Sequence, residues 1–159
     1  MVVAPRLRHG LSATHPASSM ALALFPQPHM ETAAARTVLR ILVADDDADM
    51  RLYLRSCLRT LSASGYGSVR IHEAADGREA LHLARALLPD LIISDLVMPG
   101  LDGEALCHAL QADAQTAAIP FLLISGEATP PKGGEGFLPK PFNAARLRTE
   151  VLRLLRGPP

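Results

Sequence analysis

The sequence predicts an α/β domain in which a parallel sheet carries helices on both faces. From residue 38 onward, strand-like apolar segments alternate with amphipathic helical segments, which is the pattern of β-α-β units. Two of the strand-like segments, residues 90–95 and 119–125, are apolar at consecutive positions, as expected for strands covered on both faces. The 159 residues are enough for one ordinary domain with its own core, but not comfortably for two.

The elements follow one another in a regular order. Strands are expected at residues 38–44, 68–74, 90–95, 119–125 and 136–140. Helices are expected at residues 49–64, 76–88, 102–113 and 143–155.

Local signals support two of these helices. The first helix places one set of apolar side chains on a single face, namely Met50, Leu54, Cys57, Leu58 and Leu61. The second is expected to begin after an N-cap at Asp76 and to end before Pro89.

Composition argues against several classes of function. Lysine plus arginine and aspartate plus glutamate number 16 each, so no net charge points to nucleic acid or an acidic partner. No apolar run has the length needed to span a bilayer. Cys57 and Cys107 both lie in apolar helical patterns, which favours small buried side chains in a reducing compartment over a disulfide or metal site. We therefore expect a cytoplasmic protein with neither a nucleic-acid nor a membrane partner.

Residues 1–37 differ in character from residues 38–157, which we interpret as the folded domain. No acidic residue precedes Glu31, prolines are frequent, and no steady helical or strand period runs through the segment. This pattern predicts a disordered or loosely attached N-terminal extension. The acid-free start, with its arginines and serines, also resembles a transit peptide, although no amphipathic helix is evident. The apolar residues 20–25 could dock on the domain.

Polar side chains gather where the predicted strands end. Asp45 and Asp46 follow the first strand, Asp95 ends the third, Ser125 ends the fourth and Lys140 ends the fifth. In open parallel sheets the carboxyl ends of the strands meet at one edge, where function lies. Crowded carboxylates raise one another's pKa unless a cation joins them. A few hard oxygen ligands suit Mg²⁺, so the pattern predicts a divalent-metal site.

The neighbouring acids have a different explanation. Asp47 and Asp49 fall at the start of the first helix, where carboxylates satisfy unpaired N–H groups and complement the helix dipole. A competing interpretation is enzymatic, because "ILVADDD" also resembles the start of haloacid-dehalogenase-type phosphatases, with Asp45 as nucleophile and Asp47 as general acid. No cap insertion is evident in the chain to support it.

Four segments in order carry a more extensive resemblance. "ILVADDDADMR", "LIISDLVMPGLDG", "FLLIS" and "FLPKPF" together resemble the receiver domain of two-component response regulators. The resemblance covers residues 38 to about 155. It implies a flavodoxin-like, doubly wound fold with five parallel strands.

The resemblance also assigns roles to the acidic residues. It implies that Asp95 is the phosphoacceptor, which takes a phosphoryl group from a histidine kinase phosphohistidine or a small phosphodonor. Asp45 and Asp46, with the backbone carbonyl of Val97 and with Asp95 itself, would hold Mg²⁺. Such a site works by positioning and charge neutralisation.

Three further residues acquire expected roles in the same way. Lys140 would pair with a phosphoryl oxygen, and it is one of only two lysines in the chain. Ser125 would donate its hydroxyl to the phosphoryl group and act as a switch, although it could simply satisfy loop backbone. Phe137 occupies the position of an aromatic that turns inward on activation, although a core position would explain it equally well.

The sequence departs from the family pattern between Ser125 and Phe137. "GEATPPKGGEG" is rich in proline, which breaks helices, and in glycine, which costs about 1 kcal/mol per site in a helix. The fourth helix of the family is therefore expected to be shortened or replaced by a loop. Apolar residues at 120–124 or 136–138 would then lose their cover, and such a patch indicates an interface. A homodimer or a downstream target would meet the fourth-helix, fifth-strand and fifth-helix face.

These expectations define a stand-alone regulator of a two-component phosphorelay. It would be a phosphoacceptor signalling protein and not an enzyme, assisting only its own phosphorylation and dephosphorylation. Its partners would be a sensor histidine kinase or a histidine phosphotransfer protein. The alternatives are the phosphatase described above and a receiver-fold binding module that works independently of phosphorylation.

Overall fold

The computed structural model describes residues 38–127 and 135–157. The strands are β1 (Val38–Ala44), β2 (Ser68–Ala74), β3 (Leu91–Asp95), β4 (Phe121–Ser125) and β5 (Gly136–Pro139). The helices are α1 (Ala48–Arg59), α2 (Gly77–Leu87), α3 (Gly103–Gln111) and α4 (Ala144–Arg156), with a short 3-10 helix, η2 (Thr60–Ser64), after α1. The predicted extension, residues 1–37, lies outside the described residues.

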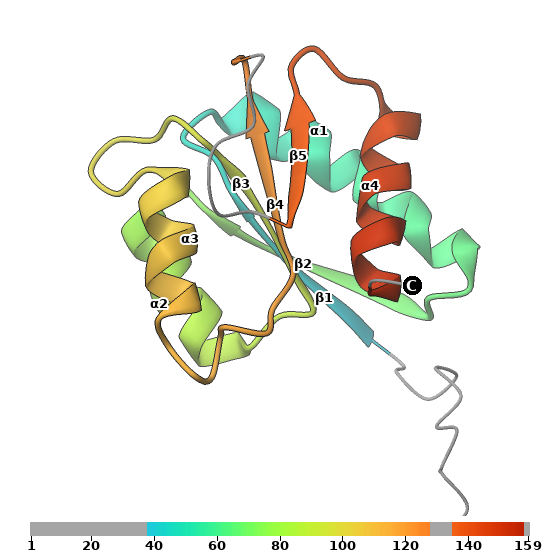
Figure 1. The fold of residues 1–159 in the computed structure, drawn as a ribbon. Helices are drawn as coiled ribbons and strands as arrows, with labels where there is room; N and C mark the ends of the chain where they lie inside the picture. The colour runs from blue at the N-terminus through green and yellow to red at the C-terminus, as the bar shows by residue number, and fades with distance from the viewer. Residues whose placement is uncertain (1–37, 128–134, 158–159) are drawn as a thin grey trace, which may run out of the picture. The chain divides into compact units, whose positions relative to one another are not determined.

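The five strands form one parallel sheet in the order β2-β1-β3-β4-β5. Helices α2 and α3 cover one face, and α1 and α4 cover the other (Figure 1). The predicted doubly wound, flavodoxin-like fold is therefore confirmed. Because all strands run the same way, their carboxyl ends share one edge of the sheet.

Each face of the sheet has its own apolar core. On the α1 and α4 side, Ile41 and Val43 of β1 pack with side chains that include Leu54 and Val151. Leu42 of β1 points the other way and packs among residues of α2 and α3. This alternation follows from the strand period of two, and it explains why the central strands carry apolar residues at consecutive positions.

The N-terminal signals of the helices act as the sequence predicts. The Asp76 carboxylate accepts hydrogen bonds from the backbone N–H groups of Arg78 and Glu79, which caps α2. The last helix, α4, is capped in the same way by Asn143. These bonds satisfy N–H groups that have no partner within the helix.

The first predicted helix ends earlier than expected. The prediction of one helix over residues 49–64 was wrong at its end, because α1 stops at Arg59 and the chain tightens into η2. The N–H of Thr60 donates to the carbonyls of both Cys57 and Leu58, a shared bond that is common where an α-helix tightens. Leu61 still reaches the core, with 1% of its surface exposed.

Neither Cys57 nor Cys107 forms a disulfide, and Cys107 is buried while Cys57 is half-buried. They pack on opposite sides of the sheet, with the α2–α3 and α1–α4 cores respectively. The prediction of small, apolar-like cysteines without a disulfide is confirmed. Within residues 38–127 and 135–157, no helix combines the length and apolar character needed to cross a membrane.

The connection between β4 and β5 is short. No helix begins in its described residues, Gly126, Glu127 and Glu135, while residues 128–134 lie outside the described part. The shortened or missing fourth helix of the prediction is consistent with this arrangement. The family's fifth helix is accordingly labelled α4 here.

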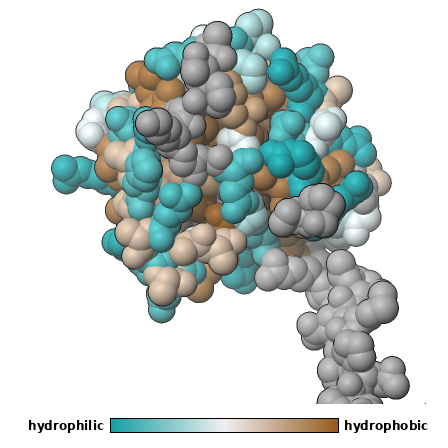
Figure 2. Space-filling view, in the orientation of Figure 1, coloured by the Kyte–Doolittle hydropathy of each residue, from teal (hydrophilic) through white to brown (hydrophobic). Residues whose placement is uncertain are grey.

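The predicted loss of cover does not occur on β4. All five of its residues are buried, and Leu122 and Ile124 are fully enclosed by the core that α4 closes. Phe121 and Leu123 pack on the other side with α3. In contrast to β4, β5 has half-buried positions, at Phe137 and Pro139. Hydrophobic residues on the face shown in Figure 2 are interspersed with hydrophilic ones.

Candidate functional site

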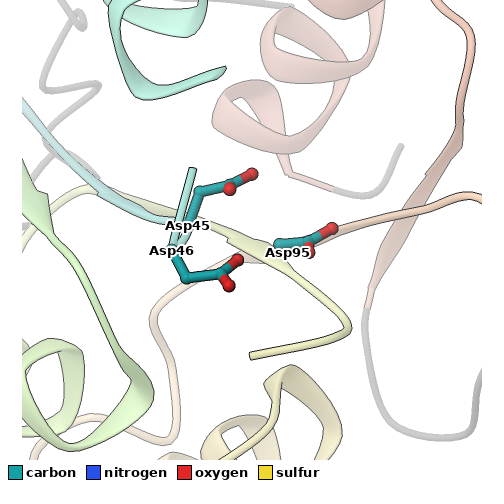
Figure 3. Close-up of side chains that lie close together, drawn as sticks. All are labelled: Asp45, Asp46 and Asp95. Carbon is teal, nitrogen blue, oxygen red and sulfur yellow. The ribbon is translucent and has the colours of Figure 1, made fainter. Parts of the chain in front are cut away.

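Three carboxylates meet at the carboxyl-end edge of the sheet. Asp45 and Asp46 follow β1, and Asp95 is the last residue of β3. One oxygen of each lies within 4.8 Å of the others, an arrangement able to hold a metal ion. Figure 3 shows the Asp45 and Asp46 carboxylates directed toward the side on which Asp95 lies. The predicted acidic cluster therefore forms, because neighbouring parallel strands bring together residues far apart in the sequence.

Asp45 is the most enclosed member of the cluster, with 1% of its surface exposed. Its Oδ1 accepts a hydrogen bond from the Asp47 backbone N–H at 2.9 Å. Its Oδ2 is buried and has no hydrogen-bond partner among the described residues. Burial raises the pKa of Asp45; the hydrogen bond from Asp47 lowers it, and the nearby Asp95 charge raises it again.

An unpartnered buried carboxylate oxygen is costly unless something positively charged meets it. The donors here are carboxylate oxygens, which are the ligands that Mg²⁺ prefers. Asp46 is exposed, so the cluster is open to solvent on one side. The residues present therefore fit a small hard cation.

Lys140 reaches the same cluster from the end of β5. Its Nζ donates to Asp95 Oδ1 at 2.8 Å and lies 3.9 Å from Asp45 Oδ2. The side chain is 28% exposed, so the ammonium is accessible from solvent. The Lys140 ammonium therefore forms ion pairs with two acids of the cluster.

Ser125 ends β4 at the same edge and is 1% exposed. Its hydroxyl oxygen accepts a hydrogen bond from the Glu127 backbone N–H at 3.0 Å. Its carbonyl accepts one from the Lys140 N–H at 2.7 Å, which ties the ends of β4 and β5 together. The expected backbone role of Ser125 is thus present in the structure.

The other two predicted site residues are Val97 and Phe137. Val97 stands two residues after Asp95 on the loop toward α3, with 68% of its surface exposed. Phe137 is half-buried and packs against the core on the α2–α3 side of the sheet. The role of the Val97 carbonyl as a ligand and that of Phe137 as a switch stay predictions.

Asp47 and Asp49 belong to the helix start and not to the cluster. Asp47 is the N-cap of α1, and its carboxylate accepts a hydrogen bond from the Asp49 N–H at 2.9 Å. Asp49 lies in the first turn of the same helix. The helix-terminus interpretation of both acids is confirmed.

A close approach of two backbones holds Asp95 in place. Gly103, the first residue of α3, donates its N–H to the Leu96 carbonyl at 2.9 Å. A Cβ atom at Gly103 would lie 2.2 Å from the Asp95 carbonyl oxygen. Only glycine lets α3 begin this close to the end of β3.

One contact at the site was not predicted from the sequence. Arg51 of α1 donates from Nη1 to the backbone carbonyl of Asp45 at 2.7 Å. Its Nε lies 3.6 Å from the Glu73 carboxylate on β2. The helical period places Arg51 on α1, but no signal in the sequence indicates that its side chain turns back to the end of β1.

Comparison with known proteins identifies the class of domain. The family model for the response regulator receiver domain matches residues 41–152. The chain therefore belongs to the receiver domain family of response regulators. This is the family that the four sequence segments resemble.

Curated relatives carry the same region within longer proteins. The response regulator MprA of Mycolicibacterium vanbaalenii is 36% identical over 125 residues, which span 74% of this chain and 51% of the relative. The sensor histidine kinase TmoS of Ectopseudomonas mendocina is 32% identical over 123 residues, which span 73% of this chain and 12% of the relative. This chain thus matches about half of one relative and a small part of the other.

Solved structures show the same fold. The chemotaxis protein CheY4 of Vibrio cholerae superposes with a TM-score of 0.64 at 32% identity. The match covers 74% of this chain and 98% of that structure. The part of the chain that is matched is therefore one complete receiver domain.

Proposed function

We propose that this chain is a phosphorylation-controlled signalling module, in which Asp95 receives a phosphoryl group from a sensor histidine kinase or a histidine phosphotransfer protein. The observation that carries the proposal is the meeting of Asp95 with Asp45, Asp46 and Lys140 at one sheet edge, in a member of the receiver family. A location in the cytoplasm is part of the same proposal.

The acidic cluster would hold Mg²⁺ through Asp45, Asp46 and Asp95, together with the Val97 carbonyl. The unpartnered Oδ2 of Asp45 and the proximity of the three carboxylates support this assignment. When bound, Mg²⁺ supplies positive charge that offsets the repulsion between the carboxylates and the phosphoryl oxygens.

Asp95 would act as the nucleophile. One of its carboxylate oxygens forms a bond to phosphorus while the bond between phosphorus and the donor histidine nitrogen breaks. The electron pair of the broken bond leaves with that nitrogen. Lys140 holds Asp95 Oδ1 at 2.8 Å, which orients the carboxylate and keeps a positive charge beside the incoming group.

Ser125 would respond to the new phosphoryl group. A hydroxyl offers one proton and two acceptor positions, and the Glu127 N–H uses one of these acceptor positions. The proton therefore remains to be donated to a phosphoryl oxygen. Because Glu127 is bonded to Ser125, movement of the hydroxyl would carry the following turn with it.

The output would be a protein contact on the β5 and α4 face. Phe137 is half-buried on β5, and it would change its packing when the turn after Ser125 moves. A downstream target or a second copy of the chain would read this change. In the competing possibility of a phosphorylation-independent module, the same face would bind its partner without the phosphoryl group.

The test is transfer of label from a small phosphodonor such as acetyl phosphate, in Mg²⁺. We expect the wild-type protein to take up label, and Asp95→Asn to take up none. Asp47→Asn is the matched control, because Asp47 caps α1 two residues beyond Asp45 and should retain labelling. Chelation of Mg²⁺ should abolish labelling in all forms.

Two results would contradict the proposal. Asp95→Asn that labels as well as wild type would exclude Asp95 as the acceptor. Turnover of a phosphomonoester that is lost in Asp45→Asn but kept in Asp95→Asn would favour the phosphatase. Gel filtration and solution scattering with and without beryllium fluoride and Mg²⁺ then test the output, since a phosphorylation-independent module would show no change.

A further inference from the structure

The peptide group that joins Asp45 to Asp46 has an unusual anchor. Its carbonyl oxygen accepts a hydrogen bond at 2.7 Å from Nη1 of Arg51, which lies 6 residues further along the chain. The Arg51 side chain is 18% exposed, so the guanidinium is largely enclosed where it makes this contact. A charged, partly buried donor on a backbone carbonyl is stronger than a neutral hydrogen bond.

The geometry of this peptide group decides where two carboxylates point. In an extended strand, consecutive side chains point to opposite faces. Here the consecutive residues Asp45 and Asp46 bring carboxylate oxygens within 4.8 Å of each other and of Asp95. The backbone therefore leaves strand geometry after β1, and the chain bends at Asp46. The carbonyl held by Arg51 lies at this bend.

A second contact fixes the other side of the guanidinium. Arg51 Nε lies 3.6 Å from the carboxylate of Glu73, which pairs with Val43 in the register between β2 and β1. Glu73 also accepts a hydrogen bond from Arg55 at 3.0 Å. Arg51 thus links α1, β2 and the end of β1, whereas the contacts found for Arg55 link only α1 and β2.

We propose that Arg51 is a positioning residue for the cation site, which holds the bend between Asp45 and Asp46 so that both carboxylates face Asp95. It acts through the Asp45 carbonyl and touches no metal. The planar guanidinium meets the carbonyl with one nitrogen and Glu73 with another, a geometry that a lysine ammonium does not reproduce. This inference rests on the proposed function, since it assumes that the cluster binds Mg²⁺.

The test is Mg²⁺ affinity, measured by titration and followed through backbone amide NMR shifts at residues 45–47. Arg51→Met keeps most of the apolar stem and removes the guanidinium. Residues that orient metal ligands typically change affinity by 10- to 100-fold when replaced, so we expect binding weaker by about tenfold or more. Arg55→Met is the matched control, because it removes the other arginine that contacts Glu73; its affinity should stay within about twofold of wild type.

Conservative replacement separates positioning from a general effect on the helix. In Arg51→Lys, the ammonium can contact either the Asp45 carbonyl or the Glu73 carboxylate, but not both at once. This variant should therefore bind Mg²⁺ more tightly than Arg51→Met and more weakly than wild type. Arg51→Met should also shift the Asp46 amide signal before any Mg²⁺ is added, because the bend loses its anchor. If Arg51→Met does not fold, Arg51→Lys compared with Arg55→Lys decides the question, with the weaker binding expected in Arg51→Lys.

The outcomes distinguish this inference from the proposed function. Equal Mg²⁺ affinity in wild type, Arg51→Met and Arg51→Lys would overturn the role of Arg51 alone. Equal weakening in Arg51→Met and Arg55→Met would also overturn it, because loss of contact with Glu73 would then suffice. If wild type shows no Mg²⁺-dependent shift at residues 45–47, or if Asp46→Asn binds as well as wild type, both the metal site and the role of Arg51 are overturned.

Discussion

Replacement of Gly103 by alanine tests how the fold holds Asp95. The new Cβ would lie 2.2 Å from the Asp95 carbonyl oxygen, 2.9 Å from Leu123 Cδ2 and 3.0 Å from the Leu96 Cα. Real Cβ contacts essentially never fall below 3.0 Å, so the contact with the oxygen must widen by about 0.8 Å. Because that oxygen belongs to backbone, either the end of β3 or the start of α3 has to move.

The cost follows from two opposing effects. Overpacking of this kind costs about 1–3 kcal/mol, while alanine gains at most about 1 kcal/mol over glycine in a helix. We expect a net loss of about 1–2 kcal/mol in the free energy of unfolding. This corresponds to a fall of roughly 5–10 °C in Tm, measured by circular dichroism.

The same change should affect phosphorylation beyond its effect on stability. A displacement approaching 1 Å at a reacting group costs up to about 100-fold in rate, so we expect labelling of Asp95 to slow by at least about tenfold. Gly136→Ala is the control: its Cβ would meet side-chain ends of Leu154 and Leu122 at 2.8 and 3.0 Å, at the start of β5. It should lower Tm without slowing the labelling of the folded protein.

Either of two results would refute this reasoning. An unchanged Tm in Gly103→Ala would mean that the approach of α3 to β3 does not need glycine. If Gly103→Ala has a lowered Tm but is labelled at the same rate as Gly136→Ala, the close approach of α3 to β3 supports the fold but does not position Asp95.

Further outcomes are expected for three variants, Asp45→Asn, Lys140→Met and Leu138→Ala. Without Mg²⁺, Asp45→Asn should unfold at a higher temperature than wild type at pH 7, because burial raises the pKa of Asp45 in the folded state and its charged form is costly there. The difference in unfolding temperature should shrink as pH falls through that raised pKa. It should vanish below the pKa of Asp45 in the unfolded chain, which is about 4. Mg²⁺ should stabilise wild type most at neutral pH and should not stabilise Asp45→Asn, as thermal melts would show. Lys140→Met should slow the labelling of Asp95 by about 100-fold, yet calorimetry should show Mg²⁺ bound at least as tightly, because a competing ammonium is removed. Leu138→Ala, at a fully buried position of β5, should cost about 2–5 kcal/mol in urea unfolding.

Much of the fold could be predicted because its signals are local. The buried strands β3 and β4 contain short runs of apolar residues, and such runs are typical of strands in a sheet that is covered on both faces. The cap at Asp76 is equally local, since its carboxylate bonds to N–H groups two and three residues away. The acidic cluster could be predicted because parallel strands end at one edge whatever their detailed packing.

The remaining features depend on contacts between distant residues. The ion pair of Lys140 with Asp95 and the bond from Arg51 to Asp45 require side-chain directions that no pattern of residue types specifies. Burial of β4 was missed for a related reason. The missing helix predicts an uncovered strand, whereas α3 and α4 close over its two faces.

The charges of the site explain why Asp45, its most buried acid, has one carboxylate oxygen without a hydrogen-bond partner among the described residues. Three carboxylates face one ammonium, which leaves an excess of two negative charges when all are ionised. Lys140 is nearest Asp95 and stands 3.9 Å from Asp45, so Asp45 Oδ2 remains the unpartnered atom and carries the cost of burial. A divalent cation would cancel that excess, and a phosphoryl group on Asp95 would restore negative charge beside Lys140 and Ser125. Under the proposed function, the stability cost of the uncompensated acid at Asp45 would keep the site responsive to the cation and the phosphoryl group together.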